Sequence, residues 1–310
     1  MNDRRYAMNV AVSEMAFWNE PRDTWEKIGS VVPGVEMMFG GPRDDDASKQ
    51  IQELKMLISQ NVSGIVVFSN DPNAVAPVID HAIEQGIPVI TAFADVPSKR
   101  LTYIGTNQKR LAGEIANRVM EDFKEQINLI TGRPKALIAL GRKESQDQWE
   151  RAQGIRDAIG RSIDLVGCVE DRFNASVAEQ EILKAFDTYI DIDFIFGCNS
   201  QSAIGAVDAL KRLKKKRGEV VVTGWDTEQK VMEQIEADRE DGGWIHATAV
   251  LHSSYMVQVC FAILEAENFG YSYPDTLNTR ELRLPAIPDT IEIPMKNLVT
   301  SKNVNEYLGK

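Results

Sequence analysis

The sequence predicts an α/β protein of two lobes, each a doubly wound parallel sheet. Apolar runs that suit strands alternate with amphipathic segments that suit helices along most of the 310 residues, and such alternation implies right-handed βαβ units. Most of the runs are almost continuously apolar, which is typical of strands buried on both faces of a parallel sheet. The alternation also continues for longer than one open sheet usually allows, which favours two sheets.

The expected strands are short apolar runs that end in polar or turn-forming residues. In chain order they are residues 8–15, 35–41, 64–70, 87–93, 102–106, 135–141, 164–170, 193–199, 219–226, 244–250 and 289–295. The expected helices carry their apolar residues on one stripe, and residues 73–86 end in Gly86, a helix-stop signal. They are residues 47–60, 73–86, 111–123, 202–213 and 253–270.

Residues 94–106 break this rhythm, because one strand follows another there without an intervening helix. We interpret this helix-free passage as a hinge between the two lobes. A TIM barrel is the other common arrangement of about eight βα units, and the break makes it less favoured than a bilobal protein.

The composition excludes several classes of function. Acidic residues outnumber basic ones by 46 to 35, which gives a net charge of −11 that would repel both DNA and an anionic membrane surface. The basic run at residues 211–218 is expected to be the last turn of a helix, where cations suit the helix dipole. The three cysteines and three histidines show no metal-ligand spacing, so neither a metal nor a cofactor is expected.

Neither a membrane span nor a secretion signal is recognisable. No run of about 18 apolar residues occurs, and residues 1–15 lack the apolar stretch of a signal peptide. Two explanations stay open at this point: the protein is cytosolic, or a leader was removed from this chain.

The common catalytic motifs are also absent. The sequence contains no G-x-G-x-x-G after a strand, no P-loop and no G-x-S-x-G nucleophile elbow. The acidic loop at residues 40–46 would repel phosphate, and its aspartates are helix N-cap candidates instead. An enzyme of the usual nucleotide-binding or hydrolase types therefore has no support.

Polar and aromatic side chains follow the expected strands, at the carboxyl ends where open α/β sheets bind ligands. They include rings, carboxylates, an amide and arginines, without a nucleophile paired to a base. Sugar hydroxyls both donate and accept hydrogen bonds, and the C–H faces of a sugar stack on aromatic rings, so this set suits a polyhydroxylated ligand. The candidates are Phe17, Trp18, Asp95, Arg151, Phe173, Asn199, Trp225 and Asp226.

Each candidate also has a structural explanation. Asn199 and Asp226 are placed to cap the helices expected to start near Ser202 and Glu228. Arg151 could pair with a neighbouring carboxylate on a solvated face, and the aromatic rings could simply fill a core.

Six segments follow one another in an order that a known family shares. They are GIVVFSNDPNAV (64–75) with GIPVIT (86–91), YIGTNQKRLAG (103–113), ERAQGI (150–155), FIFGCNSQSAIGAVDAL (194–210), VVVTGWDT (220–227) and IPMKNLVTSKNVNEYL (293–308). Over nearly the whole chain, these segments resemble the type I periplasmic sugar-binding proteins, the group of ribose-binding protein. The resemblance implies a Venus-flytrap protein: two lobes joined by three crossover segments close on one ligand, without chemistry, and a membrane transporter or receptor reads the closed form.

The same resemblance assigns roles to named positions. The family's stacking rings match Phe17 or Trp18 and, more loosely, Phe173, and its hydroxyl-binding groups match Arg151, Asn199 and Asp226. Two customary groups are missing. Where the family has an Asp this chain has Phe93 and then Ala94, and where the family has a Gln it has Leu251, so Asp95 and His252 are the candidate substitutes. A deoxy-sugar, a modified sugar or a furanosyl signalling molecule therefore fits as well as a common aldose.

We expect residues 1–107 with 249–282 to form the N-terminal lobe, and residues 108–248 with 283–310 to form the C-terminal lobe. The expected protein is a periplasmic or extracellular monomer that presents a sugar-like ligand to a membrane ABC permease. Three alternatives stay open: a sensor for a membrane receptor or histidine kinase, a transcriptional effector domain, and an enzyme such as a sugar isomerase. Against the effector domain, no helix-turn-helix precedes residue 8.

Overall fold

The computed structural model describes residues 4–130, 132–189, 191–236, 243–269 and 287–308, and they form two compact α/β units. The first unit comprises Met1–Thr106 and His252–Ile293, and the second comprises Asn107–Leu251 and Pro294–Lys310. The chain therefore passes from one unit to the other three times, as the family resemblance implies. No helix within the described residues is long and apolar enough to span a membrane.

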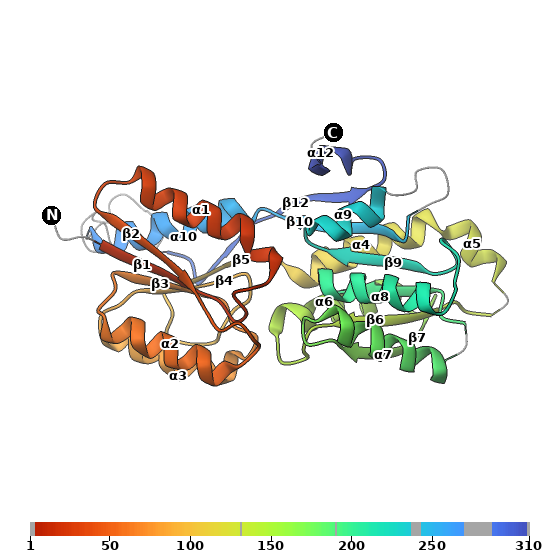
Figure 1. Cartoon of the computed structure of the whole chain (residues 1–310), viewed down its shortest axis with the longest axis horizontal. Coiled ribbons are helices and arrows are strands. Elements are labelled where there is room, and N and C mark those ends of the chain that lie inside the picture. Colours follow the sequence, from red (N-terminus) through yellow and green to blue (C-terminus); the bar gives the residue numbers. More distant parts are fainter. Residues whose placement is uncertain (1–3, 131, 190, 237–242, 270–286, 309–310) are drawn as a thin grey trace. The chain divides into compact units, whose positions relative to one another are not determined.

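The first unit is built on a six-stranded sheet in the order β11-β5-β4-β3-β1-β2, and every neighbouring pair in it is parallel. Figure 1 shows helices α1 and α10 on one face of this sheet and α2 and α3 on the other. The elements are β1 (Arg4–Asn9), η1 (Ala16–Trp18), α1 (Asn19–Val31), β2 (Val35–Gly40), α2 (Ala47–Ser59), β3 (Gly64–Val67), α3 (Pro72–Glu84), β4 (Val89–Ala92), β5 (Thr102–Gly105), α10 (Ser253–Asn268) and β11 (Thr290–Glu292).

The second unit repeats the plan, with strand order β12-β10-β9-β8-β6-β7; only the pair of β12 with β10 is antiparallel. Its elements are α4 (Gln108–Asp122), α5 (Lys124–Leu129), β6 (Lys135–Leu140), α6 (Gln146–Ile159), β7 (Asp164–Glu170), α7 (Ala175–Thr188), β8 (Phe194–Gly197), α8 (Ser200–Arg212), β9 (Val221–Trp225), α9 (Gln229–Glu236), β10 (Ile245–Leu251), β12 (Met295–Thr300) and α12 (Asn305–Leu308).

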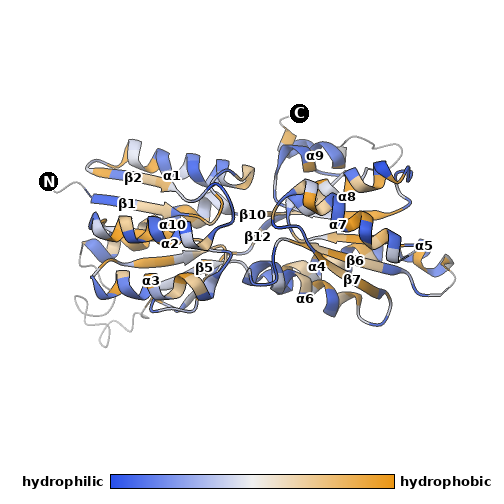
Figure 2. Ribbon diagram, turned by 60° about the horizontal axis from the view of Figure 1, so that its bottom comes forward, coloured by the Kyte–Doolittle hydropathy of each residue, from blue (hydrophilic) through white to orange (hydrophobic). Residues whose placement is uncertain are grey.

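Each sheet separates two hydrophobic cores. In β3, Ile65 and Val67 pack with the residues of α2 and α3, whereas Val66 joins the core on the other face. In the second unit, one core includes residues of α4 and α6 and the other includes residues of α7, α8 and α9. Strands such as β6 are accordingly drawn in hydrophobic colours in Figure 2. The doubly wound fold class is confirmed, and the near-continuous apolar runs have the expected cause, burial on both faces.

Several predicted boundaries differ from the structure. The first strand lies at Arg4–Asn9, where it pairs with β2 and β3, rather than at residues 8–15. Helix α1, at Asn19–Val31, was not among the expected helices. The last predicted strand, residues 289–295, covers β11 but reaches only the first residue of β12, and β11 pairs with β5 in the first sheet. The third crossing therefore falls at residues 293 and 294 instead of residues 282 and 283. The predicted boundary itself lies outside the described residues.

Candidate functional site

The carboxyl ends of four adjacent strands in the second sheet gather the candidate polar groups. Strands β9, β8, β6 and β7 are neighbours in that order, and all run parallel, so the residues that follow them share one edge. Asp226 follows β9, Asn199 lies two residues after β8 and Asp171 follows β7. Helix α6, which begins after β6, adds Asp147, Gln148 and Arg151.

Arg151 is the most restrained side chain at this edge. Its Nε donates to Oε1 of Gln108 at 2.9 Å and its Nη1 donates to the Cys198 carbonyl at 2.7 Å. Nη2 lies 3.3 Å from Oδ2 of Asp147, and both side chains of this pair are 6% exposed. The guanidinium carbon also sits 4.0 Å from the centre of the Trp225 ring. The possibility of a pair on a solvated face is therefore excluded: the partner is Asp147, and the pair is buried.

Asn199 belongs to the same hydrogen-bond network. Its Oδ1 accepts from the Ser202 amide at 2.8 Å and so caps α8, as the sequence indicated. Its Nδ2 donates to Oε1 of Gln148 at 3.1 Å, and that oxygen also accepts from the Gly141 amide at 3.1 Å. Capping and network bonds hold the amide in one orientation at the end of β8.

Asp171 and Phe173 form the next part of the edge. Oδ1 of Asp171 accepts from the Phe173 amide at 2.8 Å, and Oδ2 accepts from the Ser202 hydroxyl. Burial raises the pKa of Asp171 to about 6, although these hydrogen bonds oppose the shift. Phe173 has a φ of 58°, in the left-handed region, and its ring lies where a Cβ at Gly141 would come within 2.4 Å. Gly141 thus leaves the space that the half-buried ring occupies.

Asp226 differs from these groups because, among the described residues, its carboxylate has no hydrogen-bond partner. Only its backbone is engaged: the amide donates to the Ala249 carbonyl at 2.8 Å, and the carbonyl accepts from the Thr248 hydroxyl at 3.0 Å. Its φ of 72° is strained for a residue with a side chain. Burial raises the pKa of Asp226 to about 7, Arg151 lowers it, and Asp147 and Glu228 raise it further. The described contacts therefore show no cap on α9 from this carboxylate.

The first unit presents an aromatic cluster at the carboxyl ends of β3 and β4. Phe17 and Trp18, from η1, meet Phe68 and Phe93, which follow the two strands; the ring centres lie 4.7 to 5.4 Å apart with edge-on geometry. Trp18 is 1% exposed and Phe93 is 4% exposed, whereas Phe17 is only partly buried. The sequence could not decide whether Phe17 or Trp18 is the candidate stacking ring, and of the two Phe17 is the more accessible.

The structure gives Asp95 a structural environment. Its Oδ1 accepts from Nε of Arg100 at 2.6 Å and from the Thr91 hydroxyl at 2.7 Å, and its Oδ2 accepts from Nη2 of Arg100 at 2.6 Å. Arg100 also reaches Asp289 at 2.8 Å. This ion-pair cluster explains the carboxylate without a ligand. His252 occupies the residue before α10 and is partly buried, with its ring 6.4 Å from that of Tyr255.

Some of these residues could not be found from the sequence. Gln108 lies 43 positions before the arginine that it contacts, and no local pattern links the two. Phe68 follows a strand as an ordinary apolar residue would. By contrast, the spacing of Asp147 and Arg151 by four residues is the usual one for an ion pair along a helix, and it was one of the pairings that the sequence allowed.

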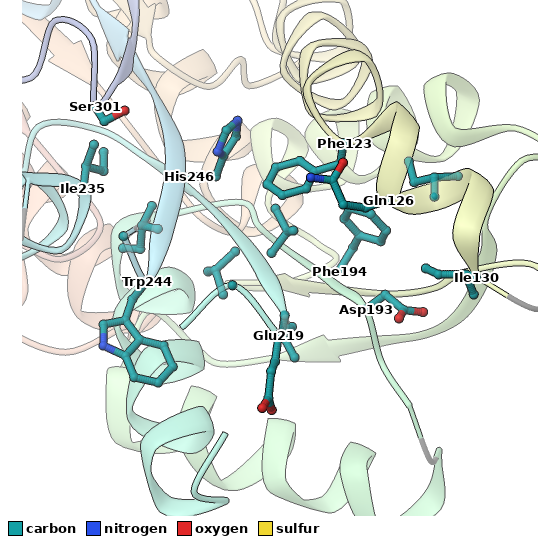
Figure 3. A pocket seen from close by; sticks show the side chains of 17 residues that line it. Phe123, Gln126, Ile130, Asp193, Phe194, Glu219, Ile235, Trp244, His246 and Ser301 are labelled. Atoms are coloured by element: carbon teal, nitrogen blue, oxygen red, sulfur yellow. The ribbon is translucent and has the colours of Figure 1, made fainter. Parts of the chain in front are cut away.

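A separate cavity of about 360 Å³ opens at the opposite edge of the second sheet. Figure 3 shows Phe123, Phe194 and His246 among its walls, near the amino ends of β8 and β10. Nε2 of His246 lies 2.8 Å from Oδ2 of Asp122. The cavity also reaches the amino end of β9, whereas Asn199 and Asp226 lie at the carboxyl ends of β8 and β9, so the cavity is distinct from the candidate site.

The comparison with known families identifies the family of this chain. A family profile described as "Periplasmic binding protein domain" matches residues 6–268. The chain belongs to this family. The binding protein is 21% identical over 306 residues to a candidate rhizopine-binding protein of Rhizobium meliloti, covering 97% of this chain and 92% of the relative. It is 22% identical over 306 residues to the D-galactose/methyl-galactoside binding periplasmic protein of Haemophilus influenzae, and the alignment covers 92% of this chain and 89% of the relative.

Solved structures show the same fold. A solute-binding protein of Burkholderia graminis in complex with D-arabinose superimposes with a TM-score of 0.84 at 21% identity. The superposition covers 99% of the present chain and 98% of the Burkholderia chain. The glucose-galactose binding protein GanP of Geobacillus stearothermophilus gives a TM-score of 0.82 at 20% identity, and the superposition covers 98% of the present chain and 99% of the GanP chain. These structures support the assignment of the type I periplasmic binding protein fold.

Proposed function

We propose that this protein captures a small, hydroxyl-rich ligand of the sugar class and presents it to a membrane ABC transporter. The observation that carries the proposal is that two groups lie at the same edge of the second sheet. One is the carboxylate of Asp226, which has no hydrogen-bond partner among the described residues, and the other is the restrained guanidinium of Arg151. A hydroxyl group both donates and accepts, so it can bind a carboxylate and a guanidinium in turn. Relatives and structural neighbours named for galactose, ribose and arabinose support the same class of ligand.

The proposed contacts divide into two sets. Arg151, Asn199 and Asp226 bind hydroxyls at the edge of the second sheet, and Phe173 supplies a ring there. In the first unit, Phe17 is the proposed stacking ring, because it is the more exposed of the two candidate rings. Trp18 supports it from the core, Asp95 belongs to the Arg100 cluster, and His252 stays a proposed contact of that unit.

The rest of the assignment follows from the family. We place the protein in the periplasm or outside the cell, as a monomer, with an ABC permease as its partner. A second candidate is a ligand-sensing protein that docks on a membrane receptor; a structural neighbour of the same fold in a XylFII–LytSN complex favours it. Copurification with a candidate permease or with a candidate receptor ectodomain, with and without ligand, separates the two.

The first test is thermal unfolding with a panel of D-ribose, D-arabinose, D-galactose, D-fucose and myo-inositol. A ligand that binds only the native state at about 100 times its Kd stabilises it by about 2.7 kcal/mol, which raises Tm by several degrees. Asp226→Asn should reduce that rise, because hydrogen bonds to a charged group contribute about 1.5–3 kcal/mol.

The matched control is Asp208→Asn, which changes an exposed carboxylate on α8. It should leave the ligand-induced rise in Tm as it is in the unaltered protein. If Asp226→Asn also keeps the full rise, the binding site lies elsewhere; if no sugar or polyol shifts Tm, the proposed ligand class is wrong.

A further inference from the structure

Four partners hold the Arg151 side chain, and they come from four different elements. Gln108 begins α4, Cys198 follows β8, Asp147 lies one turn earlier in α6 and Trp225 ends β9. Three of them bind the edge of the guanidinium and the fourth lies under its face. An arginine side chain loses rotamer entropy when it is fixed, and here the protein has fixed it within its own fold.

The donors of this guanidinium are only partly used. Of its five N–H bonds, one on Nε binds Gln108, one on Nη1 binds Cys198 and one on Nη2 faces Asp147. Within the described part of the chain, this leaves one N–H on each terminal nitrogen. Two donors held at fixed positions on a planar group suit two oxygen atoms of one ligand, such as neighbouring hydroxyls.

Trp225 does not have the environment of a ring that stacks on a ligand. It is 1% exposed and packs in the core of its own unit, which includes Cys198, Phe196 and Leu251. The Arg151 guanidinium covers one face of the ring at 4.0 Å. Its buried Nε1 has no partner among the described residues, so a direct bond from this N–H to a ligand is the competing role.

We propose that Trp225, Asp147 and Gln108 are positioning residues, which act on the ligand by fixing the two free donors of Arg151. This inference rests on the proposed sugar-binding function, and it changes the expected role of Trp225 from a ring that stacks on the ligand to a support for the arginine. Asp147 provides the counter-charge that a buried guanidinium requires, and Trp225 provides the cation–π surface. The affinity for hydroxyls then depends on residues that do not contact them.

The first experiment needs no ligand. In ¹H–¹⁵N spectra of the full chain, a fixed guanidinium gives slowly rotating, separately resolved Nη signals, and Arg151→Lys assigns them by their loss. Trp225→Leu and Asp147→Asn should merge or broaden these signals. The conservative Trp225→Phe keeps a ring and should preserve them. Gln108→Leu should broaden the Nε–H signal.

Two control variants match the changes in size and charge. Trp244→Leu removes another largely buried tryptophan of the same unit, at 8% exposure, whose ring lies near Lys211 and Arg217 instead of Arg151. Asp157→Asn removes a carboxylate from the same helix α6, where it pairs with Lys109 at 2.7 Å on the surface. Both controls can lower Tm, but neither should move the Arg151 signals.

The second experiment measures Kd by titration calorimetry for each of the five panel compounds. For any compound that binds, Trp225→Leu and Asp147→Asn should each weaken binding about tenfold, which corresponds to a lost interaction of about 1.4 kcal/mol. Neither should have much further effect once Arg151→Lys is present, because both act through that residue. Trp225→Phe should restore most of the affinity that Trp225→Leu loses.

The outcomes separate this inference from the proposed function. If the Arg151 signals respond as expected but no panel compound binds, the positioning stands as a structural fact and the sugar-binding function fails. If compounds bind but Trp225→Phe weakens binding as much as Trp225→Leu, the indole N–H contacts the ligand and the inference is overturned. Variants that lower Tm while leaving both the Arg151 signals and Kd unchanged would also overturn it.

Discussion

At the scale of single residues, Asp226 combines an open carboxylate, a strained backbone and an unusual pKa. The left-handed φ of 72° costs about 1–3 kcal/mol and persists only where the surrounding fold enforces it. Here the fold does so through the backbone bonds to Ala249 and Thr248. Strain of this kind, at a partly buried carboxylate with no hydrogen-bond partner among the described residues, is typical of a functional site.

The pKa of Asp226 predicts how the stability of the ligand-free protein depends on pH. The folded-state value of about 7 lies above the ordinary 3.8, so the native carboxyl keeps a proton that the unfolded chain releases. Its contribution to stability is complete below pH 3.8 and is lost as the pH rises through about 7. Asp226→Asn should therefore flatten the fall in Tm between about pH 4 and pH 8.

Burial also raises the pKa of Asp171, to about 6. A smaller fall in Tm with rising pH should therefore persist in the Asp226→Asn variant. The measurement is Tm by calorimetry across this range. Asp208→Asn, on an exposed face of α8, should retain the full dependence. An Asp226→Asn variant with an unchanged profile would show that this carboxyl is ionised throughout.

At the scale of elements, helices α4 and α6 place Gln108 against Arg151, and a glycine of each helix lies where the two helices approach closely. A Cβ at Gly154 would lie 2.0 Å from the Lys109 carbonyl oxygen, whereas one at Gly113 would lie 3.4 Å from the Gly154 carbonyl oxygen. The first distance is a backbone clash and the second is an ordinary contact. The two positions face each other, yet only one of them requires glycine.

Gly154→Ala should therefore lower the free energy of unfolding by about 1–3 kcal/mol, because the helices must move apart. Gly113→Ala is the matched variant: alanine is the better helix former by up to about 1 kcal/mol, so its stability should be equal or slightly higher. Denaturant unfolding of both variants checks this pair of expectations, which equal losses would contradict.

At the scale of the whole molecule, each unit is assembled from distant parts of the chain. The strand β11 completes the first sheet beside β5, and Arg100 secures the segment before it by contacts to Asp95 and Asp289. The Arg100 side chain is 6% exposed. This cluster links the loop after β4 to the last segment of the first unit.

Removing this arginine should loosen one unit and leave the other intact. Arg100→Met leaves Asp95 largely buried without its counter-charge, which costs about 3–5 kcal/mol, and amide exchange should quicken in β4, β5 and β11. The neighbouring Lys99→Met removes an exposed pair with Glu84, which contributes at most about 1 kcal/mol. If amides of β4, β5 and β11 exchange at equal rates in Arg100→Met and Lys99→Met, the Arg100 cluster does not stabilise β11.

The elements that the sequence predicted best are the buried parallel strands and the capped helices. The cap of α8 by Asn199 was found because capping is a local interaction, written in residues 199 to 202. Strand β12 was missed because its residues pair antiparallel with β10, and only the partner strand gives them a sheet environment. The first strand was placed too late and α1 was not predicted, because an apolar run does not mark where a strand ends and a helix begins.

By itself, the sequence determined the fold class, the two-unit plan and the edge of the sheet at which the candidate residues lie. Apolar periodicity, caps and family-like segments are properties of neighbouring residues, so they can be read along the chain. Only the tertiary structure decided which candidates are accessible and which are supports: Phe17 instead of Trp18, an open Asp226, a Trp225 covered by Arg151, and an Asp95 engaged by Arg100. These distinctions depend on burial and on partners that are distant in sequence, because packing decides which face of a side chain remains free.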